Sequence, residues 1–512
     1  MKVAPILAAA LFFTAAGAAA ADPAVSPPEY WPTHGWRESS PERQGIDSAK
    51  LSAVWGYVRD HQTPLHSLLL VRNGYVVLDA AFYPYDRSVP HDLASGTKSV
   101  TATLIGAAIE RGRIHSVHDP LLPHFQERRI LNRDSSKDSF TVEDLLIMRS
   151  GLACEADPGE PREMRASTDW VQFVLDQPLR YRPGAHYLYS SSSMHLLAAT
   201  LRQAAGMSPL DFARTALFEP LGIEGAIWPA DNSGVNHGWG DLYLFPRDMA
   251  KIGFLLLHGG VWDGGRILPA DFVRAATRLQ AKTDYSSDYG YGWWIFRGER
   301  RGDFEAVGRG GQRISVVPRL NLVAVMTGGG FDPTPVGELI SQAVVSDCPL
   351  PENAGARAAL RDLASTAEAA PAEEGEPVPF TVDQQSFGGT YMLSKNPFGL
   401  ALITFDFQTP TRATLELSFA DGRQRRHAIG FGRNPCFSPG ENVALMVGVH
   451  GKWTTPAHLS LVYDEVASIN CITFEADFSV RHVRFTAADR TYRNSHSEFE
   501  GQLTVSRPSP AN

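Results

Sequence analysis

A serine and a lysine stand three residues apart in the stretch Leu93–Ser99, and they constrain this 512-residue chain more than any other feature. The apolar residues that follow recur at helical spacing as far as Gly112, so we expect a helix to begin at Ser95. Residues three apart share one face of a helix, which places the Lys98 amine beside the Ser95 hydroxyl. The hydroxyl would also lie at the positive end of the helix. A neighbouring amine can activate a weak alcohol nucleophile in this way.

Two later segments carry the polar groups that such a nucleophile needs. Tyr189 follows a Pro-Gly turn and precedes a helical pattern that ends at Gly206, so we expect it in a loop from which its phenol can point into a cleft. The glycine-rich stretch Gly308–Gln312 continues into a strand that we predict over residues 311–317 and that enters a hairpin. Glycines in a strand let the backbone approach a bound ligand closely. The chain order is therefore serine and lysine, then tyrosine, then a basic residue before glycines.

In this combination the chain resembles the superfamily of serine β-lactamases and penicillin-binding proteins. The resemblance is closest to the class C-like branch of esterases, amidases, D-aminopeptidases and 6-aminohexanoate-dimer hydrolases. Further phrases that look like those of family members are Ser150-Gly151-Leu152, Tyr289 to Trp294 and Arg266-Ile267-Leu268-Pro269. The resemblance runs from Leu51 to Asp347. It implies an α/β (α+β) fold in which an antiparallel sheet is flanked by helices and carries a helical subdomain.

The resemblance also assigns catalytic roles. Ser95 corresponds to the family's nucleophile, and Lys98 to the lysine of its Ser-x-x-Lys motif, where it acts as general base. Tyr189 corresponds to the tyrosine of the Tyr-x-Asn motif and would assist in proton transfer. We therefore expect a serine hydrolase that works through an acyl-enzyme and needs neither a metal nor another cofactor.

Two positions depart from the family pattern. Ser191 stands in place of the asparagine, and Arg309 in place of a lysine or histidine. Arginine stays charged at any working pH, so it cannot relay protons, but it can bind a carboxylate through two parallel hydrogen bonds. The resemblance implies that Gly310, Gly311 and Gln312 line the cleft beside them, with the Gln312 N–H group holding an oxyanion. Both departures argue against efficient β-lactam hydrolysis.

The substrate class follows from these residues only in outline. We expect a small-molecule ester or amide as substrate. β-Lactamase activity and D-aminopeptidase or DD-peptidase activity are alternatives within the same class of enzyme. A different class remains open as well, namely a non-catalytic protein that binds cell-wall peptides or β-lactams as a sensor.

The first residues and the composition indicate where the protein works. Residues 1–21 have a basic start, a short apolar core and a run of alanines before Asp22, as a signal peptide does. We therefore expect export to the periplasm or secretion. No later stretch approaches the roughly 20 apolar residues of a membrane span, so no stable membrane insertion is expected. The net charge of −9 argues against nucleic-acid binding.

The chain is long enough for two domains. We assign residues 22–350 to the hydrolase domain and residues 351–379, which are rich in alanine, glutamate and proline, to a linker. Residues 380–512 contain regularly spaced, alternating segments that predict a small antiparallel β-barrel or sandwich, similar to the lipocalin-like barrel that some relatives carry.

The chain has four cysteines. In an exported protein the simplest pairing joins Cys436 to Cys471 and Cys154 to Cys348, within each region. Reduced, buried thiols are the alternative.

Overall fold

The computed structural model describes residues 27–154, 161–369, 382–431, 435–440, 446–491 and 495–506, so the predicted signal peptide lies outside the described residues. Within this part of the chain, an antiparallel sheet of seven strands has the order β2-β1-β11-β10-β9-β8-β7. Its strands are β1 (Leu65–Arg72), β2 (Tyr75–Ala81), β7 (Asp288–Tyr289), β8 (Trp294–Ile295), β9 (Phe304–Val307), β10 (Arg313–Val317) and β11 (Leu322–Gly328). The Asn73-Gly74 turn, a dipeptide that favours tight hairpin turns, joins β1 to β2.

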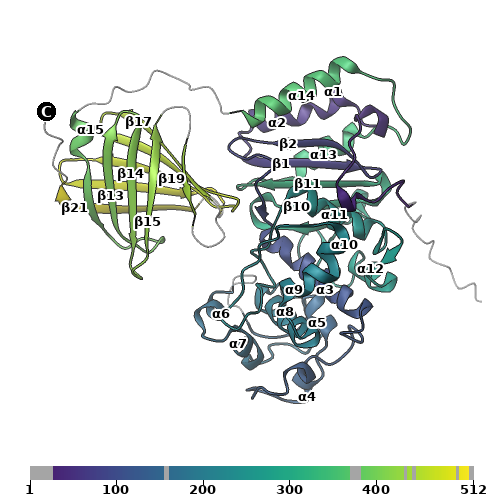
Figure 1. Ribbon diagram of the computed structural model, residues 1–512. Helices are drawn as coiled ribbons and strands as arrows, with labels where there is room; N and C mark the ends of the chain where they lie inside the picture. Colours follow the sequence, from purple (N-terminus) through teal and green to yellow (C-terminus); the bar gives the residue numbers. More distant parts are fainter. Residues whose placement is uncertain are drawn as a thin grey trace, which may run out of the picture.

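Helices cover both faces of this sheet because successive side chains of its central strands point to opposite faces. Leu69 and Val71 of β1 belong to one apolar core, and Leu68 and Leu70 belong to the other. Figure 1 shows the two layers. The helices on one side are α1 (Ser48–Leu51), α2 (Ala53–Asp60), α13 (Thr334–Ala343) and α14 (Ala354–Glu368), and those on the other include α3 (Thr97–Glu110), α8 (Ser191–Ala205) and α11 (Pro246–Leu257).

A helical subdomain lies between β2 and β7 in the sequence. Its remaining helices are α4 (Ser135–Asp138), α5 (Val142–Leu146), α6 (Arg162–Ala166), α7 (Trp170–Asp176), α9 (Pro209–Ala213), α10 (Glu219–Leu221) and α12 (Ala270–Ala276). Short strand pairs accompany them, β3 (His91–Asp92) with β4 (Tyr243–Leu244) and β5 (Val261–Trp262) with β6 (Gly265–Arg266). This confirms the predicted sheet with a helical subdomain.

The glycine-rich segment differs from its prediction as a strand. Arg309–Gly311 form a 3₁₀ turn, and β10 begins only at Arg313. The φ angles of Gly310 (82°) and Gly311 (99°) lie in the region that extended strands avoid. Between β7 and β8 the chain turns at Gly292, whose φ is 74°.

The first part of the predicted linker is a helix. Helix α14 packs against β2 and α1, with Leu360 only 3% exposed, and the Tyr83 N–H group donates to the Ala367 carbonyl at 2.8 Å. These contacts attach α14 to the hydrolase unit. Residues 370–379 of the predicted linker lie outside the described residues.

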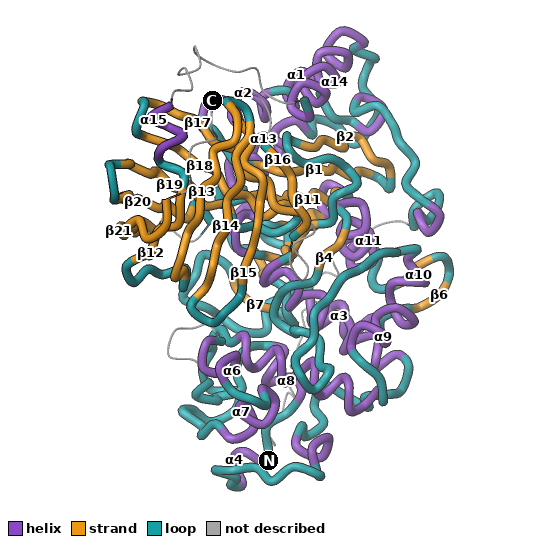
Figure 2. Tube along the Cα trace, turned by 60° about the vertical axis from the view of Figure 1, so that its left-hand side comes forward, coloured by secondary structure: helices purple, strands orange, loops and turns teal. Residues whose placement is uncertain are grey.

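The C-terminal region is a closed antiparallel barrel, drawn in yellow and green in Figure 1 and in front of the sheet in Figure 2. A short helix, α15 (Val382–Ser386), precedes it. Parallel pairing of β15 with β17 closes the ring, and the short β16 pairs with β17. Rings such as those of Phe405 and Phe485 pack in its own core. The strands are β12 (Gly389–Leu393), β13 (Leu400–Thr409), β14 (Arg412–Phe419), β15 (Gln424–Phe431), β16 (Cys436–Pro439), β17 (Met446–Thr455), β18 (His458–Val466), β19 (Cys471–Phe478), β20 (His482–Asp489) and β21 (Ser495–Ser506).

All four cysteines are thiols in this structure, which contradicts the expected pairing. Cys154 and Cys471 are buried, Cys436 is half-buried and Cys348 is exposed. Cys436 lies on β16 and pairs with β17, whereas Cys471 lies on β19 and pairs with β18, so two strands of the barrel separate these cysteines.

Among the described helices, none combines the length and the apolar character that a membrane span requires.

Candidate active site

Ser95 lies at the start of α3, in a 3₁₀ turn (Ala94–Gly96) that continues into the helix. Asp92 shapes this entry because its Oδ1 atom accepts the Ala94 N–H group at 2.7 Å, while Ala94 has a φ of 46°. A non-glycine residue in that conformation is uncommon and costs free energy. The turn places Ser95 in the lining of a cavity of about 800 Å³.

Lys98 contacts the Ser95 hydroxyl directly. Its Nζ atom donates to Ser95 Oγ at 2.9 Å and to the Trp239 carbonyl at 3.1 Å. The lysine is 1% exposed, so the amine is held away from bulk water with two neutral oxygen atoms as acceptors. This contact allows a proton to pass between the serine hydroxyl and the amine.

Tyr189 lies beside the lysine. Its ring centroid is 4.8 Å from Lys98 Nζ, and the residue lines the same cavity as Ser95. The loop that carries it ends at Ser190, whose side chain caps α8 by accepting the Ser193 N–H group. Contacts with the rings of Tyr289 and Trp294 hold the Tyr189 ring. Burial raises the pKa of Tyr289 well above its ordinary value, so this neighbour remains a neutral phenol.

The turn Gly308–Gln312 packs against the residues that precede the nucleophile. A Cβ atom on Gly308 would stand 2.1 Å from the Leu93 carbonyl oxygen, so only glycine allows this approach. The Gln312 side chain fixes the turn, since its Nε2 atom donates to the carbonyls of Arg309 (3.2 Å) and Gly328 (2.6 Å). Arg309 is exposed and lines the cavity, whereas Gln312 is 3% exposed.

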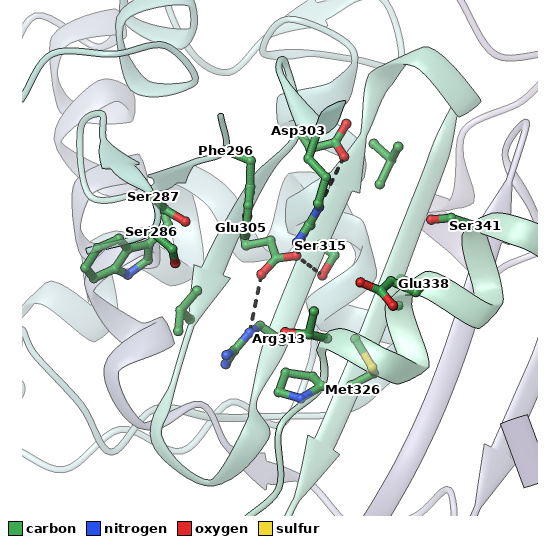
Figure 3. A pocket seen from close by; sticks show the side chains of 18 of the residues that line it. Ser286, Ser287, Phe296, Asp303, Glu305, Arg313, Ser315, Met326, Glu338 and Ser341 are labelled. Carbon is green, nitrogen blue, oxygen red and sulfur yellow. Dashed lines mark hydrogen bonds and ion pairs between the residues drawn. The ribbon is translucent and has the colours of Figure 1, made fainter. Parts of the chain in front are cut away.

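The cavity extends from Ser95 along the sheet toward helix α13, and both polar and apolar side chains line it (Figure 3). Glu305 accepts the Ser315 hydroxyl at 2.9 Å and pairs with Arg313 at 3.3 Å. Glu338 and Ser341 of α13 lie across from this cluster. Acidic and basic side chains thus both line the groove. Trp294 adds apolar surface to it, whereas Trp293 is buried in the core.

Asp303 is the most strongly perturbed acid of this groove. Its side chain is 2% exposed, and its Oδ1 atom is a buried acceptor that receives no hydrogen bond from the described residues. Burial raises the pKa of Asp303 to about 6, against the opposing effect of Arg319 and Arg300. The carboxyl group therefore titrates well above the range of an exposed aspartate.

Comparison with known proteins agrees with this architecture. A family model described as Beta-lactamase matches residues 51–345, more than half of the chain. The chain belongs to the β-lactamase family. As a family member it is a serine hydrolase of the esterase and amidase type.

Among curated relatives, 6-aminohexanoate-dimer hydrolase from Paenarthrobacter ureafaciens is 27% identical over 305 residues, which cover 54% of this chain and 75% of that protein. The β-lactamase of Escherichia coli K12 is 26% identical over 160 residues, covering 31% of this chain and 40% of that protein. Among solved structures, a penicillin-binding protein homologue from Caulobacter crescentus has a TM-score of 0.48 at 18% identity, covering 57% of this chain and 95% of that one.

The fold of this β-lactamase-family member brings three predicted site residues, Ser95, Lys98 and Tyr189, to one end of the cavity. Ser191 occupies the first turn of α8, is 1% exposed and, like Lys98, is not part of the cavity lining. Of the glycine-rich turn, Gly308 and Arg309 line the cavity, and Gly310, Gly311 and Gln312 are not among its lining residues.

Sequence reasoning missed the groups that support the predicted site. Asp92 stands three residues before the nucleophile, and its carboxylate could have been suspected as a cap. Gly308 belonged to the predicted stretch, but its contact with Leu93 depends on tertiary packing. The Trp239 carbonyl is a backbone group and carries no signal in the sequence.

Proposed function

We propose that the protein is an exported serine hydrolase that cleaves esters or linear amides through an acyl-enzyme on Ser95. The contact between Lys98 Nζ and Ser95 Oγ, at 2.9 Å in the lining of a large cavity, carries this proposal. A buried lysine can also serve only to stabilise the fold, but a lysine with that role alone would not need to contact the hydroxyl of a serine that lines a cavity. Export rests on the sequence of residues 1–21.

The proposed reaction has two half-reactions. Ser95 Oγ attacks the substrate carbonyl carbon while its proton passes to Lys98, and the backbone N–H groups of Ser95 and Gln312 hold the oxyanion. When the tetrahedral intermediate collapses, Tyr189 protonates the leaving alcohol or amine and regains its proton from Lys98. Water then attacks the acyl carbonyl, with the same groups as base and acid, and releases the carboxylic acid and Ser95.

Esters and linear amides fit the site better than β-lactams do. A curated relative is named for hydrolysis of a linear amide dimer. The groove runs away from Ser95 along the sheet and carries both acidic and basic side chains, which suits an extended substrate with charged ends. Arg309 cannot relay a proton, and Ser191 lacks the amide that would orient a lactam side chain.

Covalent labelling tests the nucleophile. Intact-mass spectrometry after treatment with a fluorophosphonate should show one adduct on the wild type and none on Ser95→Ala. A panel of 4-nitrophenyl esters, linear amides, D-amino-acid anilides and a cephalosporin should show turnover of esters or linear amides and poor turnover of the cephalosporin. Labelling that survives Ser95→Ala, or an adduct without turnover of any substrate, would contradict the proposal.

The second test concerns Lys98 and Tyr189 as one proton-transfer unit. Lys98→Ala and Tyr189→Phe should each lower kcat by about 100-fold or more, with little change in thermal stability. Because groups that act as a unit lose activity non-additively, the double variant should be only slightly worse than the worse single variant. Multiplying losses would show that the two side chains act independently.

A further inference from the structure

The barrel reaches the hydrolase unit through the turn between β18 and β19. Val466 and Ala467 of this turn are 1% and 0% exposed and pack with Tyr85, Val89 and Tyr243 of the hydrolase unit. The Ala467 carbonyl accepts a hydrogen bond at 2.8 Å from the backbone N–H of Asp92, the residue that caps the entry to Ser95. We call residues 465–470 the docking turn.

Glycines of the hydrolase unit make room for the barrel beside the glycine-rich turn. A Cβ atom on Gly310 would lie 3.2 Å from Cγ2 of Ile469 in the docking turn. A Cβ atom on Gly330 would lie 2.4 Å from the Arg490 carbonyl oxygen of the barrel. Gly330 also donates its N–H group to the Gly310 carbonyl at 3.0 Å. The barrel therefore packs against the same segment that carries Arg309.

Asn470, at the end of the docking turn, bridges the barrel and Arg309. Its Oδ1 atom accepts from Nη1 and Nη2 of Arg309 at 3.4 and 3.3 Å. Its Nδ2 atom donates to Glu465 Oε2 at 2.7 Å. Since a carboxylate only accepts and a guanidinium only donates, these two neighbours determine which way the Asn470 amide faces.

Glu465 is itself held inside the barrel. Its Oε1 atom lies 3.5 Å from Arg425 Nη1, and Arg425 donates to the Tyr463 hydroxyl at 3.3 Å. A chain of polar contacts thus runs from the barrel wall through Glu465 and Asn470 to Arg309 at the cavity. An exposed arginine samples many rotamers, and fixing its guanidinium before the substrate arrives reduces the entropy lost on binding.

We propose that Asn470 is a positioning residue for the substrate site: the docking turn of the barrel holds Arg309 so that its guanidinium binds the carboxylate of an acyl substrate that ends in one. This deepens the proposed function and rests on it. The barrel is then part of the specificity apparatus of the hydrolase and not only a cover for one side of it.

Two esters with acyl chains of the same length test this proposal on the full chain. Mono-4-nitrophenyl succinate carries the terminal carboxylate, and 4-nitrophenyl butyrate does not. Asn470→Ala should raise KM for the succinate ester about five- to tenfold while kcat and the kinetics of the butyrate ester stay within about twofold. The isosteric variant Glu465→Gln should give a smaller effect in the same direction. It allows the proposal to be tested on a folded protein if Asn470→Ala unfolds the barrel.

A double-mutant cycle with Arg309→Ala separates positioning from a general structural effect. Asn470→Ala should add little to Arg309→Ala on the succinate ester, because both act through one guanidinium. Val480→Ala is the matched control, since Val480 is 90% exposed in the β19–β20 turn, at the other end of β19 from the docking turn. It should change neither ester.

Three results would overturn the proposal: equal losses on both esters, no change in KM for the succinate ester, or additive effects of Asn470→Ala and Arg309→Ala. Failure of the proposed function gives a different result, because Ser95→Ala would then hydrolyse both esters as fast as the wild type.

Discussion

Replacing the buried Asp303 by asparagine should stabilise the protein at neutral pH and leave its stability unchanged in acid. The side chain is 2% exposed, and burial raises its pKa from the ordinary 3.8 to about 6. The folded state therefore binds this proton more tightly than the unfolded state does. The matched change to asparagine keeps the size of the side chain and removes its charge.

The sign and magnitude follow from proton linkage. Between pH 3.8 and 6 the unfolded carboxyl group ionises before the folded one, so the wild type loses stability as pH rises through this window. At about 1.4 kcal/mol for each pKa unit, the loss amounts to about 3 kcal/mol and is complete above pH 6 to 7. The amide of Asp303→Asn does not titrate, so the free energy of unfolding of this variant should exceed that of the wild type by about 3 kcal/mol more at pH 8 than at pH 3.5.

Urea unfolding followed by tryptophan fluorescence at pH values from 3.5 to 8 measures this difference. The signal reports on the hydrolase unit, because every tryptophan except Trp453 precedes residue 351. The exposed Asp284→Asn is the matched control and should show no such pH dependence. A difference between Asp303→Asn and the wild type that is flat with pH, or that favours the wild type as pH rises, would refute the reasoning.

Three further predictions test other parts of the structure. Gly308→Ala should lower kcat/KM about 100-fold, since its Cβ would stand 2.1 Å from the Leu93 carbonyl oxygen. The control Gly56→Ala, whose Cβ would have no atom within 4 Å, should keep wild-type activity, and equal activities of the two variants would refute the close approach. Iodoacetamide in denaturant without reductant should modify four cysteines, and fewer adducts would indicate a disulfide. Mild proteolysis should cut within residues 371–379, where the composition predicts a linker, before it cuts the packed helix at residues 354–368; early cleavage inside that helix would contradict its packing.

Local pattern was sufficient for the elements that lie next to the site. The apolar period after Ser95 and the glycine at 112 predicted α3, and the pattern that ends at Gly206 predicted α8. Both predictions agree with the structure because helical periodicity and glycine caps are local signals. The strand predicted to begin at Gly311 begins instead at Arg313, because Gly310 and Gly311 have positive φ angles and turn the chain. The same turn packs against Leu93, a residue far away in sequence, and no local pattern shows that contact.

The sequence by itself determined the fold class and the residues with chemistry: the Ser95–Lys98 pair, Tyr189, and the two departures at Ser191 and Arg309. These are properties of spacing and residue type. Only the tertiary structure decided that Ser191 is buried and that Arg309 contacts the barrel. Contacts between segments that are distant in the chain depend on how the two units pack against each other. The hydrophobic periodicity within one segment does not determine that packing.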